Sequence, residues 1–394
     1  MKIELSVLIV LSVLPAVFCT LTPSKKGQKG TKNPYDQLKV KEGPVDTERD
    51  LVRKDPTIKE ILVENAAYFI NTSLRNFENH VVGFVTPWNN HGYDVAKIFT
   101  NKFDVISPVW LQIHRQGKQE YRITGTHDVN EGWMNELKKN SLQRVKIVPR
   151  VIFDKFEDDD FAKLLTFREE RQVIAKLLIQ TCDIYKFDGI LLDVWSQITL
   201  RVDDPYLFEF IEDIAKPMVE RDLLVYMAVP PRRKHLHDHF TPAHFTHLWK
   251  FISGFTVMTY DYSNIRNPGP NAPYQWVRDS IEFICPNTTK NYMQKRKKIL
   301  LGLNMYGLDF TPDGGGAIIG HEYLRLLRHV KGRLALDEND EEHYFDVKTP
   351  TGRHIVFYPS LYSIKKRIDL AREMGTGLSL WELGQGLDYF YDLL

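Results

Sequence analysis

Short apolar runs recur along the chain from residue 81 to residue 384, and this recurrence constrains the fold more than any other feature. Most runs precede charged stretches whose apolar residues have helical spacing, and such alternation predicts a parallel sheet covered by helices. The runs are residues 81–88, 103–114, 145–153, 187–195, 223–231, 254–262, 298–307 and 377–384. The helical stretches are residues 131–140, 161–185, 205–222 and 360–375.

Eight strand–helix units predict an α/β fold, a closed (β/α)₈ TIM barrel over residues 80–394. An open doubly wound sheet is the alternative, and it is disfavoured because no glycine-rich nucleotide turn follows the first run. Residues 341–349 and 353–360 alternate around a turn, which predicts a small β-hairpin inserted between strands seven and eight. The glycine run at 313–316 is expected to form a flexible loop at the barrel mouth.

The N-terminal region differs from the rest in composition. Residues 1–19 have one lysine, an apolar stretch and small residues before Thr20, which predicts a cleaved secretory signal peptide rather than an anchor. Residues 20–79 are expected to form a polar linker and a helix that packs on the barrel. The sequons at Asn71 and Asn287 fit glycosylation on a luminal route.

Charge and cysteine content exclude some classes of function. The 52 basic and 51 acidic residues leave a net charge of +1, which gives no reason to expect nucleic acid or an anionic membrane as the main partner. Cys19 lies in the signal peptide, and Cys182 and Cys285 are expected to be free, buried thiols.

The apolar runs end in aromatic or acidic residues, and the functional face of a TIM barrel lies at its C-terminal strand ends. Aromatic rings stack on sugar rings, and carboxylates accept hydroxyl hydrogen bonds, so a carbohydrate site is predicted there. Core packing is the alternative for any single aromatic residue. The predicted site residues are Trp88, Trp110, Asp193, Trp195, Tyr260, Asp261, Tyr306 and Trp381.

The run FDGILLDVW at 187–195 resembles the DGxDxDxE strand of family-18 glycoside hydrolases. MTYD at 258–261, GLNMYG at 302–307 and Trp381 are similar to further motifs of that family, in the same order. The resemblance implies a substrate-assisted mechanism in which the last glutamate protonates the glycosidic oxygen.

Here that glutamate is replaced by Trp195 and the first carboxylate by Leu191, while Asp193 is retained. An indole does not act as an acid near neutral pH, so no catalytic residue and no hydrolysis are expected. Strand alternation predicts that residues 191, 193 and 195 all face the barrel interior. Asp188 is expected to be structural, bonding backbone groups across strands.

Segments 85–97, 106–112, 268–273 and 379–394 also resemble an animal branch of the family, the chitinase-like lectins. This resemblance implies a secreted protein, also endosomal or lysosomal, that binds chitooligosaccharide or lipopolysaccharide. It also implies a scavenger receptor of the stabilin type as a partner, with no nucleic acid and no membrane span.

Two other functions stay open from the sequence. One is a weak glycosidase with a displaced acid, Glu382 or Asp193, although alternation points Glu382 away from the sugar. The other is a protein-interaction scaffold with a vestigial pocket. No cofactor and no metal are predicted, and the histidines at 235–247 are expected to lie on an exposed polar loop.

Overall fold

The computed structural model describes residues 40–199, 201–233, 238–350 and 352–394. The predicted signal peptide, the first part of the linker, and His235 and His237 lie outside the described residues. None of the helices in the described ranges is long and apolar enough to cross a membrane.

All eight predicted runs form strands of one sheet, whose order is β6-β5-β8-β9-β10-β11-β12-β18-β3-β4-β7. The strands are β3 (Val81–Val85), β4 (Val105–Pro108), β5 (Leu111–Gly117), β6 (Glu120–Thr124), β7 (Lys146–Ile147), β8 (Arg150–Phe153), β9 (Gly189–Leu192), β10 (Leu224–Val229), β11 (Gly254–Val257), β12 (Ile299–Asn304) and β18 (Gly377–Trp381).

The two ends of this strand order belong to the same two runs, so the sheet closes into a barrel. β4 and β5 are successive pieces of the second run, and β7 and β8 are successive pieces of the third. Val105 pairs with Lys146 and Leu111 pairs with Val151, so both pieces join the same neighbouring run in parallel. The predicted α/β barrel is therefore confirmed.

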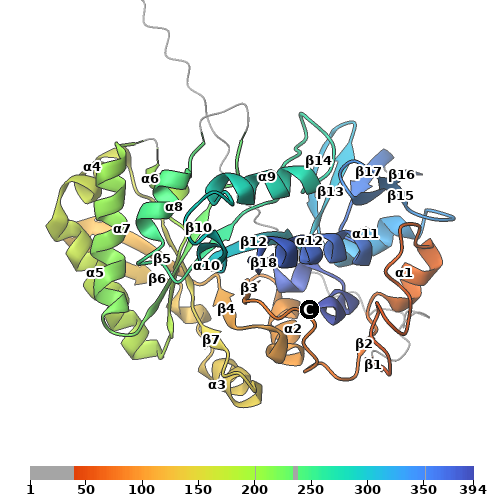
Figure 1. Cartoon of the computed structure of the whole chain (residues 1–394), viewed down its shortest axis with the longest axis horizontal. Helices are drawn as coiled ribbons and strands as arrows, with labels where there is room; N and C mark the ends of the chain where they lie inside the picture. The colour runs from red at the N-terminus through yellow and green to blue at the C-terminus, as the bar shows by residue number, and fades with distance from the viewer. Residues whose placement is uncertain (1–39, 200, 234–237, 351) are drawn as a thin grey trace, which may run out of the picture.

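Helices surround the barrel (Figure 1). They are α2 (Asn90–Ile98), α3 (Glu131–Asn140), α4 (Asp158–Thr166), α5 (Arg168–Tyr185), α6 (Trp195–Ile198), α7 (Asp204–Val219), α8 (Pro242–Leu248), α9 (Tyr274–Ile284), α10 (Tyr292–Arg296) and α12 (Leu361–Met374). Short 3₁₀ turns are η1 (Thr100–Lys102), η2 (Thr126–Asp128), η3 (Leu383–Gln385) and η4 (Asp388–Leu393).

Two apolar layers hold the barrel together. A large cluster fills the space between the strands and the outer helices. A smaller cluster fills the barrel interior and includes Phe84, Leu191 and Leu300, with Trp88 and Trp381 packed at its edge. Because the interior is filled, only the residues at the strand ends are left to contact a ligand.

The insertion between β12 and β18 is larger than the predicted hairpin. Its sheet has the order β14-β13-β17-β16-β15, and β16 and β17 are the predicted hairpin. The strands are β13 (Gly307–Thr311), β14 (Gly314–Ile318), β15 (Ala335–Asp337), β16 (Glu342–Thr349) and β17 (Gly352–Phe357), and α11 (Gly320–Leu327) follows β14.

The expectation of a flexible glycine loop at 313–316 is wrong. Gly314 to Gly316 belong to β14 and pair antiparallel with β13. Gly315 has φ of 123°, and a Cβ there would lie 2.0 Å from the Asp309 carbonyl oxygen. Glycine is required here by close strand pairing rather than by mobility.

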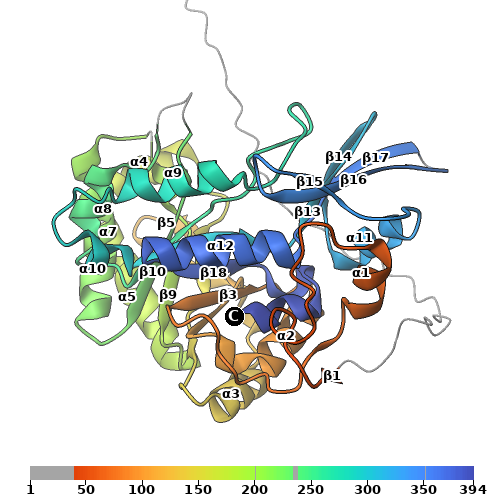
Figure 2. The same ribbon diagram turned by 45° about the vertical axis from the view of Figure 1, so that its right-hand side comes forward.

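The described part of the N-terminal segment, residues 40–79, packs against the barrel. β1 (Val40–Lys41) pairs with β2 (Tyr68–Phe69), and α1 (Ile58–Glu64) begins at Thr57, whose side chain forms a capping box with Glu60. α1 lies beside α11 in both views of the molecule (Figures 1 and 2).

Candidate functional site

The mouth of the barrel, meaning the C-terminal ends of its strands, carries an ion pair next to β9. Leu191 faces the filled interior, and Asp193 follows it two residues later. The Nε of Arg150 donates to Oδ2 of Asp193 at 2.6 Å, and each side chain is about one-fifth exposed. Arg150 begins β8, the neighbouring strand. Its place in an otherwise apolar run was the available signal that the sequence interpretation missed.

Trp195 does not face the mouth, so its assignment to the sugar site is wrong. β9 ends at Leu192 and the chain enters α6 at Trp195, which ends the strand alternation. The indole is fully buried, and its Nε1 donates to the His239 carbonyl oxygen at 2.8 Å. Its ring packs edge-on against Phe240 and His244. Trp195 is therefore part of the outer core.

Trp110 is also a core residue rather than a site residue. It lies between β4 and β5 and has no exposed area. Its Nε1 donates to the Tyr93 hydroxyl at 2.7 Å, and its ring packs against Trp133 and Phe187. Trp110 therefore has the core-packing role that the sequence left open as the alternative for any single aromatic residue.

Trp381 and Tyr260 remain at the mouth. Trp381 is half-buried at the end of β18, with its ring centre 5.2 Å from that of Phe84. Tyr260 is half-buried, and burial, with the nearby charges of Asp261 and Asp193, raises the pKa of its hydroxyl above the ordinary value.

Tyr306 and Asp261 form the wall behind Tyr260. The Tyr306 hydroxyl donates to the Asp261 carboxylate, and Tyr306 is only 3% exposed. Trp381 and Tyr260 both pack on the apolar cluster of the insertion that includes Tyr306, Leu308, Phe310 and Phe357. The insertion thus supports the mouth aromatics, and the exposed Asp261 is more accessible to a ligand than Tyr306.

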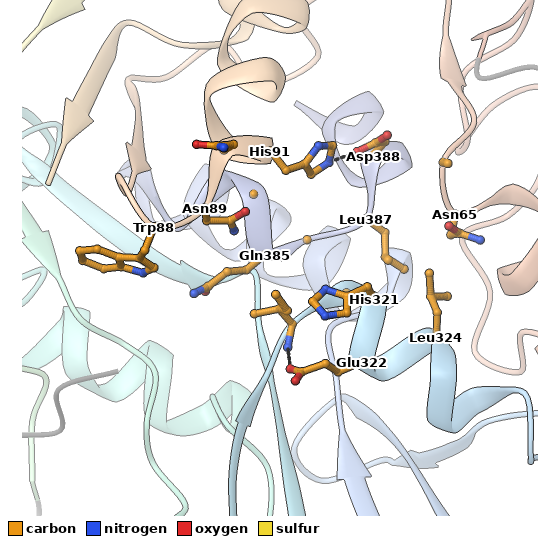
Figure 3. Close-up of a pocket in the computed structure, with 16 residues that line it drawn as sticks. Asn65, Trp88, Asn89, His91, His321, Glu322, Leu324, Gln385, Leu387 and Asp388 are labelled. Carbon is orange, nitrogen blue, oxygen red and sulfur yellow. Dashed lines mark hydrogen bonds and ion pairs between the residues drawn. The ribbon is translucent and has the colours of Figure 1, made fainter. Parts of the chain in front are cut away.

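A cavity of about 660 Å³, here called the side cavity, adjoins the mouth at Trp88 (Figure 3). Four parts of the chain line it: the β3–α2 connection, the first turn of α11, the turn η3 with the residues after it, and the N-terminal segment. The larger polar and aromatic members are Asn65, Trp88, Asn89, Asn90, His91, His321, Glu322, Gln385 and Asp388.

Of these residues, the sequence interpretation named only Trp88 as a site residue, and it placed Trp88 in a carbohydrate site at the mouth. His91 and Asp388 are paired at 2.8 Å on one side of the side cavity (Figure 3). Gln385 is 4% exposed, and its Oε1 has no hydrogen-bond partner among the described residues. An unpaired buried amide costs free energy unless a ligand or water satisfies it.

Glu382 lies behind Trp381 and is fully buried. Asn89 donates to its Oε1, and the backbone N–H of Gly384 donates to its Oε2 at 3.2 Å. Burial outweighs these bonds and raises the pKa of Glu382 to about 7. The expectation that Glu382 points away from the sugar side of Trp381 agrees with its lack of exposure.

Residues 80–386 match the sequence model of glycosyl hydrolases family 18. The chain belongs to this family. Solved structures with the same fold are a chitinase from Chromobacterium violaceum ATCC 12472 (19% identity, 80% of this chain and 97% of that one, TM-score 0.67) and a class V chitinase from Pseudomonas fluorescens Pf-5 (17%, 80% and 98%, 0.64). A third is the Cycas revoluta family-18 chitinase (16%, 79% and 97%, 0.64).

Asp188 of the family motif has the expected structural role. Its Oδ2 accepts the backbone N–H of Ile147 on the neighbouring strand at 2.9 Å, and Lys138 and Lys146 pair with it. It therefore joins β9 to β7 at the opposite end of the barrel from the mouth.

Several described histidines of this family-18 chain bond to other side chains, as His91 does to Asp388 and His247 to Glu212. The expected exposed loop is wrong for His244, which is 5% exposed on α8 and bonds Asp204 at 2.9 Å. Its place in the first turn of α8 explains this, because its ring also accepts from the Thr241 N–H. In the described part of the chain, no group of three or more His, Cys, Asp or Glu side chains is arranged to hold a metal ion.

The modification candidates and thiols are placed as follows. Asn71 and Asn287 are both exposed, as an acceptor for glycan requires. Cys182 and Cys285 are free and buried, which confirms that expectation. Burial raises the pKa of the Cys182 thiol to about 12, so this thiol is unreactive near neutral pH.

Proposed function

We propose that this family-18 barrel binds oligosaccharides of N-acetylglucosamine without hydrolysing them. The observation that carries the proposal is the composition of the mouth beside β9. Its carboxylate, Asp193, is held by the Arg150 guanidinium, and the side chain at position 195 is buried in the core. General acid catalysis requires a protonated group within reach of the leaving oxygen, and an ion-paired carboxylate is a hydrogen-bond acceptor.

The surfaces left at the mouth suit sugar binding. Trp381 and Trp88 offer ring faces, and Asp193, Asp261 and Tyr260 offer polar groups that bond hydroxyl and acetamido groups. The Cycas revoluta relative, in a mutant form, is in complex with (GlcNAc)₄, which supports this ligand class.

The cellular setting is part of the proposal. The apolar N-terminus of the sequence and the exposed sequons at Asn71 and Asn287 support a secreted protein that also reaches endosomes or lysosomes. The resemblance to the chitinase-like lectins adds lipopolysaccharide as a second ligand and a scavenger receptor of the stabilin type as a partner.

Titration calorimetry with the N-acetylglucosamine tetramer tests the binding. We expect the wild type to bind without releasing product, and Trp381→Ala to weaken binding about tenfold, which corresponds to the loss of one stacking contact. Tyr206→Ala is the control, because Tyr206 is an exposed aromatic residue on α7. Absence of binding by the wild type to every N-acetylglucosamine oligomer would overturn the proposal.

A weak glycosidase with a displaced acid is the second candidate. The pKa of about 7 at Glu382 suits acid catalysis near neutral pH, whereas the full burial of this carboxyl group behind Trp381 argues against it. Turnover of a fluorogenic chitobioside that disappears in Glu382→Gln would establish it. Turnover that persists in Glu382→Gln and disappears in Asp193→Asn would assign the acid to Asp193 instead. If the wild type releases no fluorophore, the glycosidase candidate is rejected and only the binding function remains.

A further inference from the structure

The side cavity is only partly built from the family domain. The family match begins at residue 80, yet Asn65 and Ala66 also line the cavity, and Asn65 lies opposite Trp88 (Figure 3). These two residues follow α1 in the N-terminal segment. A ligand that extends from the mouth past Trp88 therefore meets residues that precede the matched family domain.

The N-terminal segment is held firmly enough to act as a wall. The backbone N–H of Ile58 donates to Gly332 O at 3.0 Å, and that of Leu334 donates to Pro56 O at 3.1 Å. At the other end of α1, the Tyr389 N–H donates to Asn65 O at 3.3 Å. Arg49 pairs with Glu64 and with Asp392, which ties the segment to η4. Contacts on both sides of α1 thus fix the position of the 65–66 turn.

The side cavity offers several uncharged hydrogen-bonding groups. Both amide hydrogens of Asn65 are directed to the carbonyl oxygens of Ile61 and Leu62, each at 2.9 Å, which leaves Oδ1 as the atom for a ligand. The Gln385 amide has an unpaired buried oxygen, and His321 is exposed on the first turn of α11.

The charges in the side cavity argue against an anionic ligand. His91 is paired with Asp388, and Glu322 adds a carboxylate that caps α11 through the Ile319 N–H. Among the described residues that line the cavity, none is lysine or arginine. A lining of amides, imidazoles, one indole and two carboxylates, without a lysine or arginine, suits the hydroxyl and acetamido groups of a neutral saccharide.

We propose that the 65–66 turn and His321 bind the far end of an oligosaccharide whose near end lies at the mouth, so that the N-terminal segment sets the preferred ligand length. This inference rests on the proposed function. Its observable consequence is a length dependence: affinity rises from short to long oligomers only while the side cavity is intact.

The test compares the N-acetylglucosamine dimer with the pentamer by titration calorimetry. We expect the wild type to bind the pentamer at least about tenfold more tightly than the dimer, an effect of one or two added contacts. His321→Ala and Ala66→Trp, which respectively removes a polar contact and fills the wall, should each bring that ratio towards one. His329→Ala is the matched control, because His329 is exposed beyond the same helix.

The outcomes separate the two proposals. If neither oligomer binds the wild type, the proposed function fails and the inference fails with it. If the oligomers bind and both cavity variants keep the wild-type ratio, the inference alone is overturned. An equal loss of affinity for the dimer and the pentamer in both folded variants also overturns the inference, because the substitutions then affect binding at the mouth. Thermal denaturation of both variants verifies that they are folded.

Discussion

The ends of β9 and β18 use the same two residue types in opposite ways. At β9 the carboxylate of Asp193 faces the mouth and the indole of Trp195 is buried behind it. At β18 the indole of Trp381 faces the mouth and the carboxylate of Glu382 is buried behind it. Which side chain faces the mouth therefore depends on the residue at which the strand ends and on the core packing behind that residue.

The electrostatic environments of the two carboxyl groups, Asp193 and Glu382, also differ. Asp193 is partly exposed and is paired with the Arg150 guanidinium. Glu382 is surrounded by neutral donors, Asn89 and the Gly384 N–H, and burial raises its pKa to about 7. One acid is placed to accept hydrogen bonds at the mouth, and the other is placed to titrate near neutral pH within the wall.

Replacing Trp195 should give the largest effect, because it removes the buried indole behind β9. Trp195→Ala is expected to lower the free energy of unfolding by about 3–5 kcal/mol, the usual cost of deleting a large buried aromatic ring. Urea denaturation followed by circular dichroism measures it. Tyr206→Ala, which removes an exposed ring, should stay within about 0.5 kcal/mol.

A glutamate at position 195 sharpens the same comparison. Trp195→Glu combined with Leu191→Asp should not restore hydrolysis of a fluorogenic chitobioside, because the side chain at 195 points into the outer core. It should also lower stability, since it buries a carboxylate without a partner. Recovered chitinase activity in this double variant would contradict the buried orientation of Trp195.

Glu382 should make the free energy of unfolding depend on pH, an effect of intermediate size. Its folded-state pKa of about 7 lies above the ordinary 4.5, so its protonated form stabilises the fold below pH 4.5, and this contribution is lost as pH rises through 7. The loss is on the order of 3 kcal/mol by linkage.

Glu382→Gln should flatten this dependence, so its stability relative to wild type should improve between pH 5 and pH 8. Guanidinium denaturation at both pH values gives the difference. Asp392, with a pKa raised to about 6 by burial, contributes in the same direction, and Asp392→Asn measures its share separately. An identical slope in wild type and Glu382→Gln would refute the assignment of the pKa.

Breaking the ion pair between Arg150 and Asp193 should have the smallest effect on the free energy of unfolding. A double-mutant cycle with Arg150→Met and Asp193→Asn is expected to yield a coupling energy of about 1–2 kcal/mol, between the values for exposed and buried pairs. Chemical denaturation of the four proteins measures it. A coupling near zero would mean that Arg150 does not hold Asp193 in solution.

The repeated elements were predictable from the sequence, whereas the details at their ends were not. The period of apolar residues is a local property, so it located the strands and α3, which spans Glu131–Asn140 as predicted. Trp195 was misplaced because alternation was extended past Leu192, where the backbone leaves the strand. Asp188 was placed correctly because it lies directly before Gly189, where β9 begins.

The side cavity was missed for a different reason. Its lining comes from four parts of the chain that are far apart in sequence, and Asn65 and Gln385 carry no local pattern. The N-terminal segment was expected to be a polar linker and a packing helix, but its contacts with Gly332 and Asp392 were not predicted, because they are formed only in the folded chain. Long-range contacts of this kind leave no periodic signal in a single sequence.

The anchoring of the N-terminal segment also has a consequence for the order of events during synthesis. Residues 40–79 leave the ribosome before the barrel does, yet their partners at Gly332, Tyr389 and Asp392 are among the last residues to be made. This segment can therefore dock only after most of the barrel has been synthesised. Its polar composition keeps it compatible with water during that interval, and its docking is a late event that completes the folded molecule.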